Sequence, residues 1–226
     1  MKKTLLVASI LGAVSTMAST SAMAVEGLSA NAAVTSNYYW RGMTQSNDGA
    51  AVSGGIDYAD ESGAYAGVWV STLGESNTSA SSEVDYYVGY AGELEGFSYD
   101  VGYVYFAYPK KSAIPAGNAT DLDFGEIYAS VSFDNLTLGL AVLANAETDG
   151  ASFGDSTYIS ADYSLEVAEG LEAAFHIGSY DGDFANEGID LGASISKDGF
   201  TFGVVESDRD GQSLGYYVSY AVDFDL

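Results

Sequence analysis

The chain contains no cysteine, one histidine and only two prolines among its 226 residues. Without cysteine it has no disulfides, no thiol nucleophile and no thiolate-bound metal. Basic residues are also scarce, because seven lysines and arginines stand against 32 acidic residues, giving a formal net charge of −25. Binding to phosphate backbones requires clustered basic side chains. The composition therefore predicts no nucleic-acid partner.

The sequence also lacks an apolar run long enough to cross a membrane as a helix. The mainly apolar stretch at 5–17 falls short of the roughly 20 residues that a spanning helix needs. It follows two lysines and precedes a small-residue triplet at 22–24, which is the arrangement of a secretory signal peptide. We predict a signal peptide at 1–24 and a mature chain at 25–226, which has a net charge of −27 because both lysines are removed.

What is present is a period of two, in a chain with 18 tyrosines and 27 glycines. Over residues 28–41, the positions from Leu28 to Trp40 are mainly apolar and end in aromatics, whereas those from Ser29 to Arg41 are mainly polar. This alternation predicts a β-strand, and no stripe of helical period matches it. Eleven further segments show a similar pattern, each near the roughly 9–11 residues of a tilted membrane strand. They lie at 50–59, 64–71, 82–91, 97–108, 122–133, 135–145, 156–166, 170–180, 188–196, 199–207 and 212–226.

The connections between these twelve segments alternate in length. Short turns rich in turn-forming residues stand at 60–63, 93–96, 134–135, 167–170 and 197–199, and the other connections are longer and polar. This predicts an all-β fold, a transmembrane antiparallel up-and-down β-barrel of about twelve strands, with the short turns and both termini in the periplasm. A soluble barrel or sandwich would also alternate, but with a polar outside. The aromatic face of these segments favours a barrel whose outside contacts lipid.

Four segments carry a family resemblance: SNYYWRGMTQS (36–46), GGIDYADESGAYAGVWVS (54–71), EVDYYVGYAGELEGFSYDVGYVYFAYP (83–109) and FGEIYASVS (124–132). Together they resemble the bacterial TorF-type putative porins. The resemblance implies a location in the bacterial outer membrane and a channel role.

The same parity makes Arg41 an inward arginine in an acidic barrel. Tyr38 and Trp40 are then expected to face lipid, and Arg41 the lumen. Our hypothesis is a charged constriction between Arg41 and facing carboxylates, foremost Asp57 on the adjacent strand and Asp85 or Asp100 beyond it. The predicted pore-lining set is Asn37, Tyr39, Arg41, Asp57, Asp85, Asp100 and Glu126. The alternative is that Arg41 neutralises one or two buried carboxylates and locks strands together, since unpaired buried charges are costly.

Inward small residues suggest a partly thin inner wall around a narrow passage. These positions are Gly55, Ala59, Gly67, Gly89, Gly102, Gly139, Gly192, Gly203 and Ser219. Twelve strands lie between the filled eight-stranded barrels and the open barrels of 16 to 18 strands. We therefore expect a narrow channel rather than a wide one.

We predict a passive outer-membrane channel for small solutes that prefers cations or zwitterions, with no catalysis, no cofactor and no metal. Its expected partners are outer-membrane lipids, lipopolysaccharide and a small solute. A closed structural or adhesion barrel with partner-binding loops is the alternative. A hydrolase is disfavoured, because the sole histidine, His176, is expected beside Glu172 and near Ser160 or Ser194 without any spacing that specifies a Ser-His-acid site.

Overall fold

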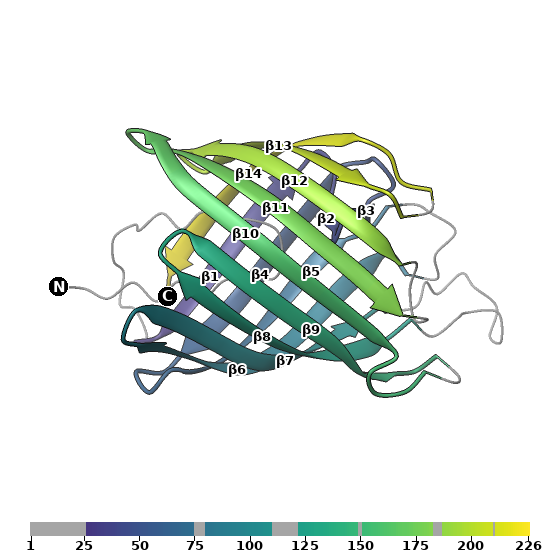
Figure 1. The fold of residues 1–226 in the computed structure, drawn as a ribbon, viewed down its shortest axis with the longest axis horizontal. Helices are drawn as coiled ribbons and strands as arrows, with labels where there is room; N and C mark the ends of the chain where they lie inside the picture. Colours follow the sequence, from purple (N-terminus) through teal and green to yellow (C-terminus); the bar gives the residue numbers. More distant parts are fainter. Residues whose placement is uncertain (1–25, 75–79, 110–121, 149–150, 183–186, 210) are drawn as a thin grey trace.

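A computed structural model describes residues 26–74, 80–109, 122–148, 151–182, 187–209 and 211–226. Twelve antiparallel strands form a closed barrel, in which each pairs with its neighbours along the chain and β1 closes the ring against β14 (Figure 1). The described residues include no helix long and apolar enough to cross a membrane. The barrel strands are β1 (Leu28–Thr35), β4 (Ala51–Ala59), β5 (Ala64–Thr72), β6 (Ser82–Leu94), β7 (Phe97–Ala107), β8 (Phe124–Phe133), β9 (Leu136–Ala146), β10 (Ser156–Ala168), β11 (Leu171–Gly182), β12 (Gly188–Lys197), β13 (Phe200–Ser207) and β14 (Gly215–Asp225).

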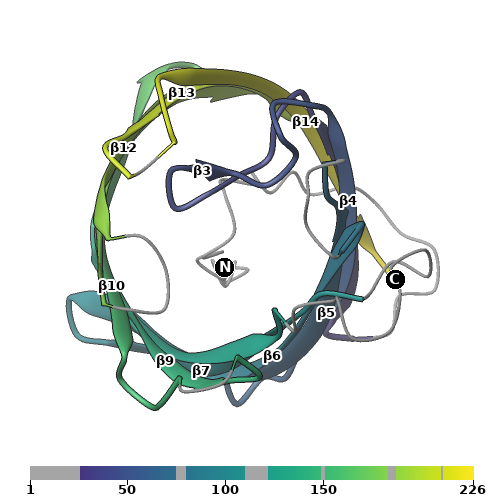
Figure 2. The same cartoon turned by 90° about the vertical axis from the view of Figure 1, so that its right-hand side faces the viewer.

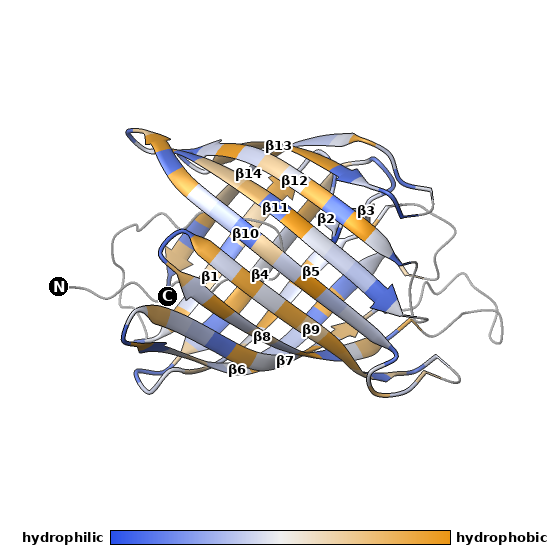
Figure 3. Cartoon of the chain, in the orientation of Figure 1, coloured by the Kyte–Doolittle hydropathy of each residue, from blue (hydrophilic) through white to orange (hydrophobic). Residues whose placement is uncertain are grey.

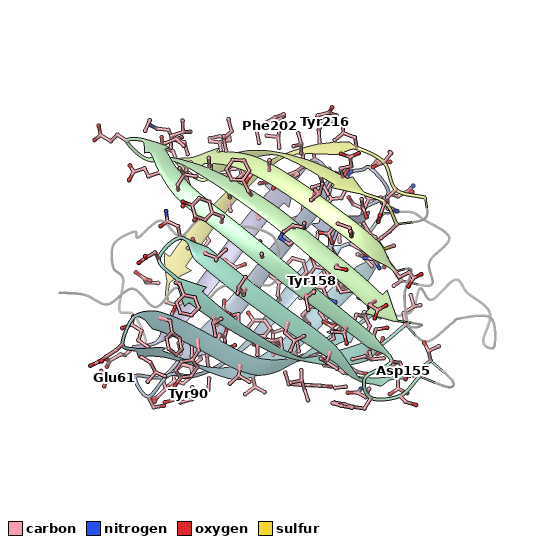
Figure 4. The ribbon with its side chains drawn as sticks, in the orientation of Figure 1. Glu61, Tyr90, Asp155, Tyr158, Phe202 and Tyr216 are labelled. Atoms are coloured by element: carbon pink, nitrogen blue, oxygen red, sulfur yellow. The ribbon has the colours of Figure 1, made fainter. Side chains whose placement is uncertain are left out.

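The predicted barrel of about twelve antiparallel strands is confirmed, and so is the alternation of its connections. The short turns lie at the end of the barrel that holds the C-terminus: Figure 4 places Glu61, in the β4–β5 turn, at that end and Asp155, before β10, at the other. One tight turn, Asp198–Gly199, has φ of 53° and 82°. Positive φ at both central residues is the type I′ geometry, whose twist matches that of a hairpin. The predicted signal peptide lies outside the described residues.

Large apolar side chains are exposed on the outside of the barrel. Figure 3 shows that hydrophobic positions recur along its strands. On β9, Leu138 and Leu140 are each 43% exposed, and on β14 Tyr216 is 57% exposed. Figure 4 shows Phe202 and Tyr216 projecting outward from β13 and β14. An exposed apolar surface that continues from strand to strand marks a surface that another apolar phase covers. This is the reverse of a soluble barrel, whose apolar side chains fill the inside.

Tyrosine rings cover several of the inward glycines. A Cβ on Gly67 would meet the Tyr87 ring, and one on Gly102 would meet the Tyr128 ring. The same holds for Gly89 beneath Tyr65 and for Gly203 beneath Tyr217. The expected thin wall is therefore wrong at these four positions, because each glycine makes room for a ring from the neighbouring strand instead of leaving a gap.

The first strand ends earlier than predicted. β1 stops at Thr35, and residues 36–50, here called the inner hairpin, fold inside the ring, where Figure 2 shows β3. The inner hairpin holds β2 (Tyr39–Trp40) and β3 (Met43–Thr44), which pair with each other in a separate two-stranded sheet. The expectation that Tyr38 and Trp40 face lipid is therefore wrong, because their alternation continues into a segment that has left the wall.

Neighbouring positions on β14 give a test of which face meets lipid. Val218→Arg, on the outer face, should lower the free energy of unfolding by up to about 2–4 kcal/mol, the cost of a basic side chain at the bilayer midplane. Ser219→Arg, on the inner face, is the matched control and should cost much less. Urea unfolding of the barrel in lipid vesicles measures both. Equal costs would contradict the assignment of the two faces.

Candidate functional site

The inner hairpin turns at Arg41 and Gly42, which have φ of 47° and 79°. Both values are positive, so this is again the geometry of a type I′ turn. Glycine adopts it freely, but a non-glycine residue in the left-handed region carries strain of about 1–3 kcal/mol. The contacts of the Arg41 side chain must offset that strain.

Asn37 organises the base of the inner hairpin. Its Nδ2 donates to the Tyr39 hydroxyl at 2.7 Å and to Asp48 Oδ1 at 2.8 Å. Its Oδ1 accepts from Thr44 Oγ1 at 2.6 Å and from Ser46 Oγ at 3.0 Å. Asn37 is buried, so the structure places this predicted pore-lining residue inside the hairpin's own polar network.

Tyr38 ties the inner hairpin to β6. Its hydroxyl donates to Glu83 Oε1 at 2.8 Å, and its ring meets Trp69 edge-on at 5.6 Å between centroids. Burial, reinforced by the charges of Glu83 and Asp85, raises the pKa of Tyr38 well above its ordinary value, so it remains a neutral donor. Tyr108 supplies a second side-chain hydrogen bond to Glu83.

Trp40 packs into an aromatic cluster on the inner wall. Its ring makes edge contacts with Phe106 and Phe124, each at 6.0 Å between centroids, and a tilted contact with Tyr180 at 6.3 Å. Phe106 and Phe124 also stack on each other at 4.6 Å. Offset and edge-on pairs of this kind add about 0.5–1.5 kcal/mol each beyond the apolar area that they bury.

Arg41 reaches a wall far from the strand that precedes it. Its Nη1 and Nη2 donate to the two carboxylate oxygens of Glu126 at 2.7 and 2.5 Å, and the two side chains are 4% and 3% exposed. Its Cζ lies 4.4 Å from the ring centroids of both Trp40 and Tyr158. Glu126 is on β8, which six strands separate from β1 in one direction round the ring and four in the other. The inner hairpin therefore crosses the interior.

A second arginine, which sequence reasoning missed, supports the turn from behind. Arg209, in the loop after β13, donates from Nη1 to the backbone oxygen of Arg41 at 3.0 Å. Its Cζ lies 4.7 Å from the Tyr180 ring centroid, and only 1% of the residue is exposed. The sequence gives no signal for this contact, because Arg209 stands in a polar loop with no periodicity.

His176 joins the same region through two carboxylates. Nδ1 lies 2.6 Å from Asp162 Oδ1, and Nε2 lies 2.8 Å from both Asp190 Oδ1 and the Tyr158 hydroxyl. Both nitrogens can donate to these carboxylates only when the ring is protonated. In the part of the chain that the structure describes, no serine hydrogen-bonds to His176, so these contacts do not include a Ser-His nucleophile pair.

The structure brings together two pairs from the predicted pore-lining set, Arg41 with Glu126 and Asn37 with Tyr39. The expected pairing of Arg41 with Asp57, Asp85 or Asp100 is wrong, because the inner hairpin carries Arg41 across the lumen to β8.

Each of those three aspartates has its own surroundings. Asp57 accepts from Tyr87 and from Asn31 Nδ2, the latter at 3.2 Å. Asp100 accepts from Tyr65 at 2.6 Å. Asp85 is fully buried, and neither of its carboxylate oxygens has a hydrogen-bond partner within the described part of the chain. Tyr39, the remaining member of the predicted set, lies over Gly215 and beside the Tyr217 ring. The described residues contain no group of three or more histidine and acidic side chains placed to hold a metal ion.

A closed twelve-stranded antiparallel barrel, apolar outside and polar within, is a transmembrane β-barrel with the fold of porins. The chain belongs to the family described as "Bacterial protein of unknown function (Gcw_chp)", whose model matches residues 18–224. That description does not carry the TorF name, although the porin-like class that the resemblance implies agrees with the fold.

Among solved structures, a KdgM porin is similar with a TM-score of 0.56 and 10% identity, over 88% of this chain and 99% of that chain. A KdgM porin in complex with disordered oligogalacturonate is similar with a TM-score of 0.51 and 9% identity, over 88% and 98%. At these identities the likeness shows the fold. No curated protein sequence matches the chain.

The buried ion pair gives a prediction for a double-mutant cycle. Arg41→Met or Glu126→Leu alone leaves one charge buried and unpaired, which should cost about 3–5 kcal/mol of hairpin docking free energy. The double variant should cost much less, because an apolar pair replaces the ion pair. Hydrogen exchange at the Gln45 amide, which donates to Tyr38 O at 2.7 Å, measures the docking. If the cost of the double variant equals the sum of the two single costs, Arg41 and Glu126 are not directly coupled.

Proposed function

We propose that the protein is an outer-membrane, porin-like passive channel whose bore the inner hairpin narrows. The observation that carries the proposal is a hairpin that crosses the interior of a closed barrel and is held there by buried contacts to β6, β8 and β12. Glu83 on β6 and Glu126 on β8 bind Tyr38 and Arg41, and the turn glycine, Gly42, lies against Asp190 on β12. A constriction formed by a folded-in segment, rather than by the wall itself, accounts for a narrow passage in a ring of this size.

The distribution of charge supports a preference for cations or zwitterions. Arg41 and Arg209 are buried, with 8% and 1% of their surfaces exposed. By contrast, the Asp162 side chain is 47% exposed, and Asp57 is half-buried. Water and ions inside the barrel therefore meet carboxylates more than arginines. A net acidic lining concentrates cations and repels anions.

The charge of the lumen distinguishes the proposed solute from the ligand of one structural neighbour. One KdgM porin structure is of a complex with oligogalacturonate, an anionic oligosaccharide. The same electrostatics that favour cations here would oppose a polyanion of that class. We therefore propose small cationic or zwitterionic solutes and no enzymatic step.

The proposed partners are outer-membrane lipids and lipopolysaccharide on the outside of the barrel. Exposed aromatic residues near the ends of β13 and β14, such as Phe200 and Tyr216, suit the interface between hydrocarbon and headgroups. This surface and the fold support the proposed location in the bacterial outer membrane.

A closed structural or adhesion barrel is the second candidate. The observation that favours it is the packing of the inner hairpin, in which Glu83, Glu126 and Arg209 are almost inaccessible to water. On this reading the hairpin is a permanent plug, and partner binding would fall to the loops at the end opposite the C-terminus.

Conductance separates the two candidates. The mature chain, refolded into a planar bilayer, should show small discrete steps and a cation-selective reversal potential across a salt gradient. Asp57→Asn together with Asp162→Asn should shift the reversal potential toward zero, because these variants remove accessible negative charge.

Replacement of residues 37–48 by a short Gly-Ser linker should raise the conductance several-fold if the inner hairpin sets the bore. Ser219→Ala, on the inner wall, is the matched control and should change neither quantity. A folded barrel without conductance would contradict the channel proposal and favour the closed structural or adhesion barrel. If the linker variant shows conductance steps of unchanged size, the inner hairpin does not set the bore of the channel.

A further inference from the structure

We infer that Glu126, Tyr158 and Tyr180 form a guanidinium-binding site on the inner wall, which Arg41 occupies as a tethered ligand and for which a free alkylguanidinium solute competes. The binding site stands on the geometry alone. The further step, that such a solute belongs to the class that passes through the barrel, rests on the proposed function.

The wall supplies the site, and the inner hairpin supplies its occupant. Glu126, Tyr158 and Tyr180 come from three different strands, β8, β10 and β11. The Arg41 Cζ lies 4.4 Å from the Tyr158 ring centroid and 5.7 Å from that of Tyr180. A carboxylate with aromatic faces around it is a site for a delocalised cation, since ring faces attract positive charge. These wall residues remain when the hairpin leaves.

The hydrogen bonds define which cation fits. Glu126 accepts one hydrogen bond from each terminal nitrogen of Arg41, so it recognises the planar –C(NH2)2 end of a guanidinium group. The Arg41 Nε is buried, and no group among the described residues hydrogen-bonds to it. The site therefore does not recognise the nitrogen that bears the carbon chain. Any guanidinium with one alkyl substituent offers the same pair of terminal nitrogens to Glu126. A primary ammonium lacks this fork and is a compact, strongly hydrated charge, so it should bind more weakly.

Competition is feasible because the tethered occupant is strained. Arg41 holds φ at 47°, a conformation that costs a non-glycine residue free energy. A free ligand does not carry that cost. It must instead overcome the high effective concentration of a side chain fixed a short distance away. Because one carboxylate cannot hold both guanidinium groups in this way, binding of a free solute and docking of Arg41 exclude each other.

Chemical rescue of Arg41→Ala tests the site in the full-length mature chain. The variant empties the site and should raise hydrogen exchange at the Gln45 amide. Ethylguanidinium should then restore protection through contact with Trp40, whose ring also lies 4.4 Å from the Arg41 Cζ. Because the Trp40 face is present only when the hairpin is docked, the ligand should bind the docked state more tightly, and the opening constant should fall by the ratio of the two binding factors, up to about eleven-fold at a ligand concentration ten times Kd.

Two controls make the result specific. Ethylammonium at the same concentration and ionic strength should rescue much less, and ethylguanidinium should not rescue Arg41→Ala/Glu126→Gln. Equal rescue by both cations, or rescue that persists without the Glu126 carboxylate, would overturn the proposal. So would the absence of any rescue in a folded variant. If Arg41→Ala does not fold, Arg41→Gly provides the same test, because it also empties the site and removes the cost of a positive φ at this position.

The exchange measurement needs no current, so it stands apart from the channel proposal. In a bilayer, millimolar ethylguanidinium should reduce the current through Arg41→Ala by a Glu126-dependent block. Rescue in exchange without any current would keep the binding site and reject the channel. Current without rescue would keep the channel and reject the binding site.

Discussion

Backbone hydrogen bonding in hydrocarbon is the constraint on which the rest of this structure depends. No water is present there to satisfy an open sheet edge, so a spanning sheet must close on itself. Here β1 meets β14 and completes a ring of twelve strands. Closure fixes the two faces of every strand, with one toward lipid and one toward the lumen. The exposed apolar belt and the polar, tyrosine-rich interior are both consequences of this arrangement.

Closure at twelve strands also creates a space that the wall does not fill alone. In an eight-stranded barrel the inward side chains suffice, whereas wider rings leave a lumen. This chain fills part of that space in two ways. Tyrosines lie over glycines of the neighbouring strand, and the inner hairpin brings Tyr38, Trp40 and Arg41 across the interior. A buried ion pair such as Arg41 with Glu126 adds little net stability compared with an apolar pair, because both charges are desolvated. Its directional bonds do set where the hairpin tip lies.

The fold was predictable because closure imposes a period of two on each wall strand, together with an alternation of short and long connections. The same period gave a wrong prediction for residues 36–41, which it placed in a wall strand. Tyr38 and Trp40 do occupy alternate apolar positions, but periodicity reports that a segment has one apolar face and not which surface covers that face. Here the aromatic cluster inside the barrel covers it. A signal for the departure exists in Gly42 and in Gly49, which follows Asn47 and Asp48, since both groups favour turns.

The candidate site was less predictable than the fold, for a physical reason. Parity places a side chain inside or outside, but it does not say how deep the side chain lies or what lies opposite. Arg41 and Glu126 are 85 positions apart and meet only because the hairpin crosses the ring. Asp57, on the strand paired with β1, is closer along the wall, yet a tyrosine and an asparagine already satisfy it. Arg209 enters from a loop to which no period applies.

The two buried arginines connect the architecture to its electrostatics. While the inner hairpin is docked, Arg41 and Arg209 are withdrawn from the lumen, and Glu126 is neutralised by the first of them. Release of the hairpin would uncover Glu126 and place the positive charge of Arg41 on a segment free to leave the pore axis. The lumen wall would then be more acidic with the hairpin released than with the hairpin docked. A cation in the barrel would therefore interact more favourably with the form in which the hairpin is released, and by linkage it would favour that release in proportion to the difference in affinity. In a barrel arranged in this way, the cations that the charges attract would also favour release of the hairpin that narrows the bore.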